Sequence, residues 1–107
     1  MSQFRNGAVA PGIAFITGGA RGLGNAIACS FAKEGSKGIA LVDIQDEKTL
    51  NEGKANVEKY GAKVITIRAD VTQEEQVERA VKETVEAFGR IDYAAFVLAP
   101  NLYCEEH

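Results

Sequence analysis

Glycine is concentrated in one short part of the chain, where it could serve the binding of a phosphate group. Gly18, Gly19, Gly22 and Gly24 lie between an apolar segment that ends at Thr17 and an apolar segment with helical spacing. A tight strand-to-helix turn needs positive φ angles or missing Cβ atoms. A diphosphate over a helix N-terminus needs backbone N–H groups that it can approach closely. The sequence therefore predicts a phosphate-binding loop; the alternative is glycine that only packs a helix against a sheet.

The elements that must position this loop alternate along the chain. Apolar or β-branched segments predict four strands, at 13–17, 38–43, 63–69 and 91–99. Helical spacing predicts three helices between them, from the glycines to near 35, over about 46–60, and from a capping box at 72–75 to 89. The inward stripe of the first helix is expected to be Leu23, Ala26, Ile27, Ser30 and Phe31. Short connections between alternating strands and helices predict right-handed crossovers and a parallel sheet.

The predicted fold class is α/β, a partial doubly wound, Rossmann-type parallel sheet of about four strands and three helices. The chain has 107 residues, of which 46% are hydrophobic, so we expect one domain with a modest core. The expected boundaries are an N-terminal tail at 1–9, an NAD(P)-binding half domain at 10–99 and a divergent C-terminal tail at 100–107.

The spacing of the glycines carries a family resemblance. The run Thr17-Gly18-x-x-x-Gly22-Leu23-Gly24 differs from the common G-x-G-x-x-G fingerprint and resembles the short-chain dehydrogenase/reductase family. Asp70-Val71 after the third strand and the stretch at 88–92 also resemble that family, over about residues 10–94 in all. The resemblance implies an NAD(P)-dependent oxidoreductase that transfers a hydride between a nicotinamide cofactor and an alcohol or ketone.

The resemblance also implies which residues bind the cofactor. They are Thr17, Gly18, Arg21, Gly22, Leu23, Gly24, Asp43, Ile44, Asp70 and Val71. Asp43 ends the second strand, where a carboxylate accepts hydrogen bonds from the adenosine ribose and repels a 2′-phosphate, so NAD is the expected cofactor. Arg21 favours the alternative, NADP. Asp70 is expected to contact the adenine ring, and a turn or helix-cap role is compatible with this.

The resemblance ends after the fourth strand begins. The family continues with a V-N-x-A-G-like stretch, whereas this chain reads A-F-V-L-A-P over 95–100. The family's chemistry needs a Ser and a Tyr-x-x-x-Lys pair, yet this sequence has no such pair and no Lys after Lys82. We therefore expect no catalytic residue here and a truncated family member that is inactive alone. The alternatives are a nucleotide- or partner-binding module and a non-functional truncated product.

Charge and composition limit the partners. The net charge of −3 and the pI near 5.2 argue against nucleic-acid binding, and no apolar run is long enough to span a bilayer. Cys29 and Cys104 lack metal-ligand spacing, so no metal is expected. A cytoplasmic location is expected. The apolar fourth strand is expected at an open sheet edge, where it would self-associate or pair with a full-length relative.

Overall fold

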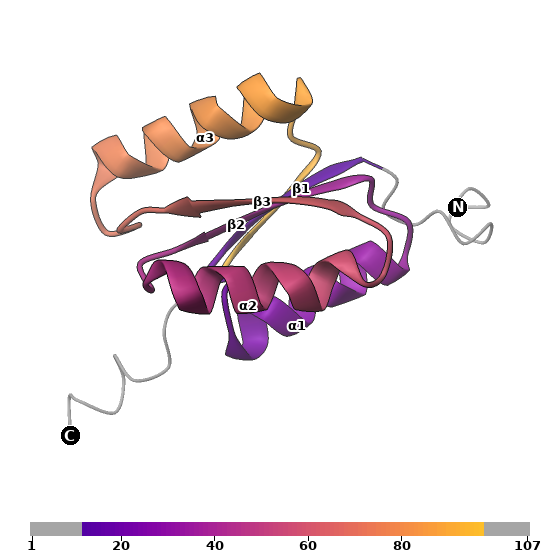
Figure 1. The fold of residues 1–107 in the computed structure, drawn as a ribbon. Helices are drawn as coiled ribbons and strands as arrows, with labels where there is room; N and C mark the ends of the chain where they lie inside the picture. The colour runs from indigo at the N-terminus through magenta and orange to yellow at the C-terminus, as the bar shows by residue number, and fades with distance from the viewer. Residues whose placement is uncertain (1–11, 98–107) are drawn as a thin grey trace.

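The computed structural model describes residues 12–97. Strands and helices alternate, as predicted (Figure 1). Their bounds are β1 Ile13–Thr17, α1 Gly22–Lys33, β2 Gly38–Asp43, α2 Glu47–Glu58, β3 Lys63–Arg68, α3 Glu74–Phe88 and β4 Tyr93–Phe96. Within this described part, no helix is both long enough and apolar enough to cross a membrane.

The four strands form one parallel sheet in the order β3-β2-β1-β4. The predicted α/β class and the parallel sheet are confirmed. β1 lies between β2 and β4, so the strand order reverses beside β1. In open α/β sheets, ligands bind outside the carboxyl ends of the strands at such a reversal.

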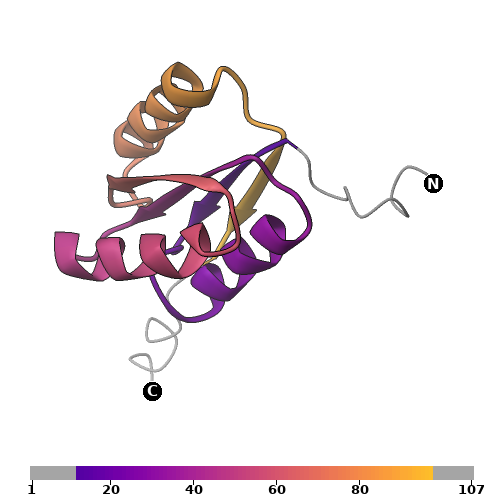
Figure 2. The same ribbon diagram turned by 45° about the vertical axis from the view of Figure 1, so that its right-hand side comes forward.

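Helices cover both faces of the sheet. α1 and α2 pack on one face and α3 lies on the other (Figures 1 and 2). All five residues of β1 are buried, and so are the first five residues of β2. This explains why both strands are almost wholly apolar instead of alternating. The central strands thus provide a rigid support for the loops at their carboxyl ends.

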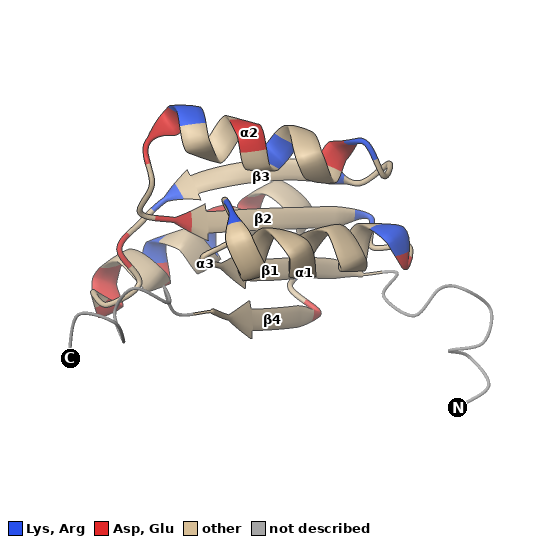
Figure 3. Cartoon of the chain, turned by 90° about the horizontal axis from the view of Figure 1, so that it is seen from below, with Lys and Arg blue, Asp and Glu red and all other residues tan. Residues whose placement is uncertain are grey.

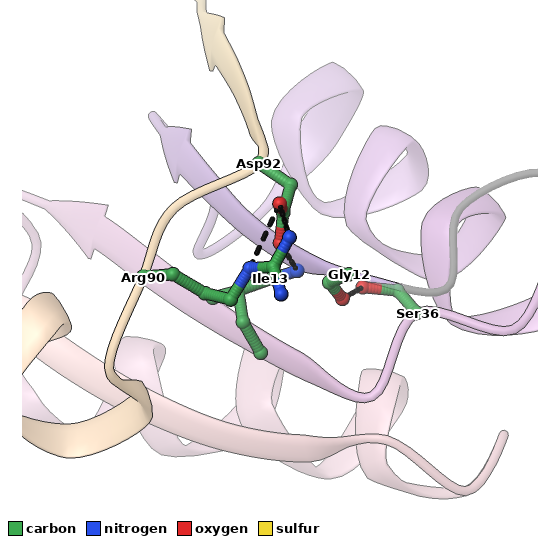
Figure 4. A network of polar contacts seen from close by, with 5 residues as sticks. All are labelled: Gly12, Ile13, Ser36, Arg90 and Asp92. Carbon is green, nitrogen blue, oxygen red and sulfur yellow. Dashed lines mark hydrogen bonds and ion pairs between the residues drawn. The ribbon is translucent and has the colours of Figure 1, made fainter.

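The amino end of the sheet is joined by a polar network (Figure 4). The Ile13 backbone N–H donates to Asp92 Oδ2 at 2.8 Å, and the Arg90 guanidinium donates to Asp92 Oδ1 at 2.6 and 3.0 Å. The pKa of the Asp92 carboxyl is below its ordinary value, mainly because of the hydrogen bond from the Ile13 N–H and to a smaller extent because of the bond from Arg90. Ser36 Oγ donates to the Gly12 carbonyl at 2.8 Å. This network fixes the start of β4 against β1, far from the strands' carboxyl ends.

Two predicted boundaries were wrong. α3 begins at Glu74 with Gln73 as its N-cap, so the capping box at Thr72 does not form. Thr72 belongs instead to the turn that precedes the helix, because its hydroxyl and its backbone N–H both donate to Asp70 Oδ1, at 2.6 and 2.9 Å. β4 is also shorter than the predicted 91–99, since Asp92 turns its side chain onto the start of β1. Residues 98 and 99 lie outside the described part.

The inward face of α1 was predicted only in part, because Ile27 and Phe31 pack against the core but the other three residues do not. Leu23, Ala26 and Ser30 are exposed, and Ile27 and Phe31 are only partly buried. The buried residues of α1 are instead Gly24, Asn25, Ala28 and Ala32. The physical reason is close packing, because a Cβ at Gly24 would collide with the Gly18 carbonyl. Small residues therefore face the sheet, and larger apolar ones flank the contact.

Candidate nucleotide-binding site

The ten predicted cofactor residues gather at the carboxyl edge of the sheet. Thr17 ends β1, and the loop after it together with the first turn of α1 holds the residues from Gly18 to Gly24. Asp43 ends β2 with Ile44 directly after it, and the turn after β3 holds Asp70 and Val71. Parallel strands end at the same edge, so three segments distant in the sequence meet there. The structure thus brings the predicted residues together, although their contact with a cofactor stays a prediction.

The glycines of the loop have different roles. Gly18 has a φ of +66°, and a Cβ there would lie 2.6 Å from the Val97 carbonyl oxygen. Gly22 has a φ of +62°, and nothing lies within 4 Å of the place that its Cβ would occupy. Gly24 faces inward onto Gly18. Of these three, only Gly22 combines the left-handed backbone with open space, so it is the glycine that a ligand could approach.

The amino end of α1 differs from that of α2. The N-cap of α1 is Arg21, whose side chain makes no capping hydrogen bond, and the first turn has no acidic residue. The N-cap of α2 is Asp46, which accepts the Thr49 N–H at 2.9 Å and has Glu47 beside it. The first N–H groups of a helix need partners, and the helix dipole favours an anion. α2 satisfies this need itself, whereas α1 is suited to an external anion.

Asp43 lies directly against the glycine loop. Its Oδ2 accepts the Ala20 N–H at 3.0 Å, and its Oδ1 accepts the Ile44 N–H at 2.7 Å. A carboxylate has about four lone-pair sites, so two bonds leave capacity for ribose hydroxyls. Asp43 therefore helps to hold the loop as well as being available to a ligand, and the first of these roles was not predicted.

Asp70 forms the turn that leads from β3 to α3. Its Oδ1 accepts both the Thr72 hydroxyl and the Thr72 N–H, which hold the pKa of the carboxyl below its ordinary value. The Asp70 N–H donates to Gln76 Oε1 at 2.7 Å. The turn role considered for Asp70 is confirmed, and this turn fixes the position of Val71 at the sheet edge.

Thr17 joins β1 to β4. It is buried, and its Oγ1 accepts the Val97 N–H at 2.9 Å and donates to the Ala95 carbonyl at 3.4 Å. Beside it lies a small cavity of about 120 Å³ lined by Thr17, Val71, Val77 and Phe96. In this structure Thr17 therefore organises the switch point between β1 and β4, and only its side facing the cavity is available to a ligand.

Apolar side chains are exposed around the same edge. Leu23, Ile44 and Phe96 are 63%, 55% and 65% exposed, more than any other large hydrophobic residue in the described part. Phe96 is the last residue of β4, Ile44 directly follows β2, and Leu23 lies in the first turn of α1, which follows β1. Large apolar side chains left open to water are typical of a binding surface, and of these three Phe96 also lines the cavity beside Thr17.

Two residues of this edge were missed by sequence reasoning. Arg68 ends β3, and its Nε donates to the Ile44 and Gln45 carbonyls at 3.3 and 3.1 Å, which braces the loop after Asp43. Asn25 is buried under the glycine loop. The signal for Arg68 was a cation at the carboxyl end of a strand, and that for Asn25 a polar residue next to the last glycine. In the described residues, no His, Cys, Asp or Glu group could hold a metal.

Comparison with known proteins identifies the relatives of this chain. A sequence model of the short chain dehydrogenase family matches residues 12–95. Levodione reductase from Leifsonia aquatica is 48% identical over 82 residues, which are 75% of this chain and 30% of that protein.

Solved structures agree. Carveol dehydrogenase from Mycobacterium avium, in complex with NAD, matches with a TM-score of 0.74 at 32% identity. The match covers 81% of this chain and 35% of the carveol dehydrogenase chain. NAD⁺-bound xylitol dehydrogenase has a TM-score of 0.73 at 33% identity and covers 79% of this chain and 32% of its own. The chain spans about a third of the length of these relatives. The chain therefore belongs to the short-chain dehydrogenase family.

Proposed function

We propose that this chain is the nucleotide-binding part of an NAD(P)-dependent oxidoreductase, and that it binds NAD. The observation that carries the proposal is Gly22, which has positive φ and open space at the uncapped amino end of α1. The diphosphate would lie against Gly22, with Leu23 beside it, and the close contacts of Gly18 and Gly24 would give the loop the shape that it needs. Two relatives of similar fold were solved with NAD bound, which supports this choice of ligand.

The predicted residues after β2 and β3 would hold the adenosine. Asp43 would accept the ribose hydroxyls, and Ile44 and Val71 would flank the adenine ring near Asp70. The residues present fit such a group, because the loop has an open glycine, an anion-binding helix end, a carboxylate and exposed apolar side chains.

The preference for NAD over NADP follows from the anchoring of Asp43. Two N–H groups hold its carboxylate, so it cannot swing away from a 2′-phosphate without losing both bonds. Like charges at close range repel strongly. Arg21 is exposed on the loop and is the group that would favour NADP. A fixed carboxylate beside the ribose outweighs a solvated cation, because water screens the exposed arginine.

Hydride transfer between the nicotinamide and an alcohol or ketone is the chemistry that the cofactor supplies when it is bound. This chain's own residues bind and orient the cofactor. This sequence has no Tyr-x-x-x-Lys pair of the kind that the family uses, so the proposal assigns no catalytic residue here. We also propose a cytoplasmic location, which is the one expected from the sequence.

The nucleotide site can be mapped by NMR. Adding NAD to the labelled chain is expected to shift the backbone amides of 18–24, 43–44 and 70–71. The amides around Gly12, Ser36 and Gly61 are at other loops and are expected to stay unchanged. Shifts confined to those control positions, or no shifts at millimolar NAD with a folded chain, would contradict the proposal.

A second proposal, self-association, concerns the edge strand β4. β4 is an outer strand of the described sheet and carries no charged residue (Figure 3), and its Phe96 is 65% exposed. The other outer strand, β3, has Lys63 and Arg68 at its ends. Uncharged edge strands pair readily with another chain. We therefore propose that copies of the chain associate through β4; a full-length relative is the other partner expected from the sequence.

Exposed alanines offer a matched test of this association. Ala94→Lys puts a charge on β4 and is expected to give a monomer in sedimentation experiments, whereas Ala55→Lys puts the same charge on α2 and is expected to leave association unchanged. A wild-type chain that is a sharply monodisperse monomer and binds no apolar dye would refute the proposal.

A further inference from the structure

The side-chain amide of Asn25 lies at the point where the glycine loop, α1 and α2 meet. Its Nδ2 donates to the Gly19 carbonyl at 2.9 Å and to the Gly53 carbonyl at 3.1 Å. Its Oδ1 accepts the Asn56 Nδ2 at 3.2 Å. The residue is 7% exposed, so these bonds form away from water and cannot be replaced by it.

Asparagine is the side chain that fits this place. The surroundings present two acceptors, the carbonyls of Gly19 and Gly53. They present two donors to the single oxygen, the Asn56 amide at 3.2 Å and the Cys29 thiol at 4.0 Å. An asparagine amide supplies two donor hydrogens and one acceptor oxygen. Aspartate would point a charge at two carbonyls, and leucine would leave both without a partner. The match indicates a specific role beyond the filling of space.

The bond to Gly19 acts on the same peptide group that Asp43 holds. The Gly19 carbonyl and the Ala20 N–H belong to one trans peptide unit, so they point in opposite directions. Asn25 holds the carbonyl, and Asp43 Oδ2 holds the N–H. This peptide lies between Gly18 and Gly22, the two loop residues with positive φ.

We propose that Asn25 is a positioning residue that, with Asp43, clamps the Gly19–Ala20 peptide and so sets the shape of the phosphate-binding loop before the cofactor arrives. This inference rests on the proposed function. The glycines leave the loop many alternative conformations, and ordering it on binding would weaken affinity. α2 takes part because Gly53 allows a close approach, since a Cβ at Gly53 would collide with the Ala20 carbonyl.

The main test replaces Asn25 by leucine in the full chain. Asn25→Leu keeps a branched side chain of the same length, although a bulkier one, and removes both donors and the acceptor. The affinity for NADH is expected to fall about tenfold. Thr84→Val is the matched control, because it also removes one buried hydrogen bond, from Thr84 Oγ1 to the Ala80 carbonyl, but on α3 across the sheet. Its affinity, corrected for the unfolded fraction, is expected to stay within about twofold of wild type.

A second measurement includes a reading on the wild type, which is independent of the variant's folding, and an internal check that the variant is folded. Hydrogen exchange of the wild-type chain is expected to show a protected Ala20 amide, and Asn25→Leu is expected to lose that protection while core amides of β2 keep theirs. An unprotected Ala20 amide in the wild type would overturn the clamp, and so would an Asn25→Leu chain that binds NADH like the wild type. A folded wild type that binds no NADH would overturn the proposed function instead, and this inference with it.

Discussion

Replacing Gly22 by alanine tests whether the open glycine of the loop serves a ligand or only the fold. The matched change is Gly61→Ala, in the turn between α2 and β3. Both glycines have positive φ, +62° and +99°, and neither would place a Cβ within 4 Å of another atom. The two substitutions therefore share one folding defect, the left-handed backbone, and differ in their location.

The expected loss of stability is similar for both variants. A side chain in the left-handed region costs about 1–2 kcal/mol, and the smaller entropy of the unfolded alanine chain returns about 0.4–1 kcal/mol. The net loss is about 1 kcal/mol. For a domain of this size that corresponds to a Tm lower by about 4–8 °C.

The expected loss of binding is confined to Gly22→Ala. Its methyl group would enter the open space in front of the α1 amino end and keep an anion from the backbone N–H groups there. One lost hydrogen bond to a charged group costs about 1.5–3 kcal/mol, which is about 10- to 150-fold in affinity. Gly61→Ala leaves this edge of the sheet untouched, so its affinity is expected to equal that of the wild type.

Two assays on the full chain separate these effects. Thermal unfolding followed by circular dichroism gives the change in stability, and NADH fluorescence, titrated well below both Tm values, gives the affinity. Equal NADH affinities for the two variants would refute the assignment of Gly22 to the ligand, whether both variants keep the wild-type affinity or both lose it.

Other changes test single contacts. Asp43→Asn keeps an acceptor for the Ala20 N–H but removes the charge, so NADPH affinity should rise relative to NADH by about tenfold; an unchanged ratio in paired titrations would show that Asp43 does not read the ribose. The pKa of Asp92 is lowered by a backbone hydrogen bond, so its contribution to stability is complete above its ordinary value of 3.8 and is lost as the pH falls through the folded value. Unfolding midpoints measured from pH 5 to pH 2 should therefore fall less steeply for Asp92→Asn, and equal slopes would contradict this. Thr17→Val leaves the Val97 N–H without its acceptor and should destabilise the chain by about 1–2 kcal/mol in urea unfolding. The amide hydrogens of β4 should also exchange faster, and unchanged exchange would contradict the role of the Thr17–Val97 hydrogen bond in holding β4.

The predictable part of this protein was the part that depends on local pattern. Apolar runs gave β1 and β2, because strands buried on both faces need no alternation. The glycine spacing indicated the loop, because a positive φ angle or a close approach of the backbone requires glycine at that one position. These features need no knowledge of what lies across the sheet.

The missed features depend on groups distant in the sequence. The role of Asn25 depends on its hydrogen bond to Gly53 on α2, and the role of Arg68 depends on its hydrogen bond to Ile44 in the loop after β2. The apolar stripe of α1 does not coincide with its buried face, because close packing on the loop selects small residues there. The pattern at Thr72 is typical of a helix cap, but Asp70 holds Thr72 in the turn before the helix through its hydroxyl and its backbone N–H.

Calorimetric titration of the folded 107-residue chain with NADH and NADPH tests the central proposal most directly. Saturable binding of NADH, weaker binding of NADPH and loss of NADH binding in Gly22→Ala are the expected results. A chain that is folded by circular dichroism, yet takes up neither nucleotide at millimolar concentration, would contradict the assignment of this loop to a dinucleotide.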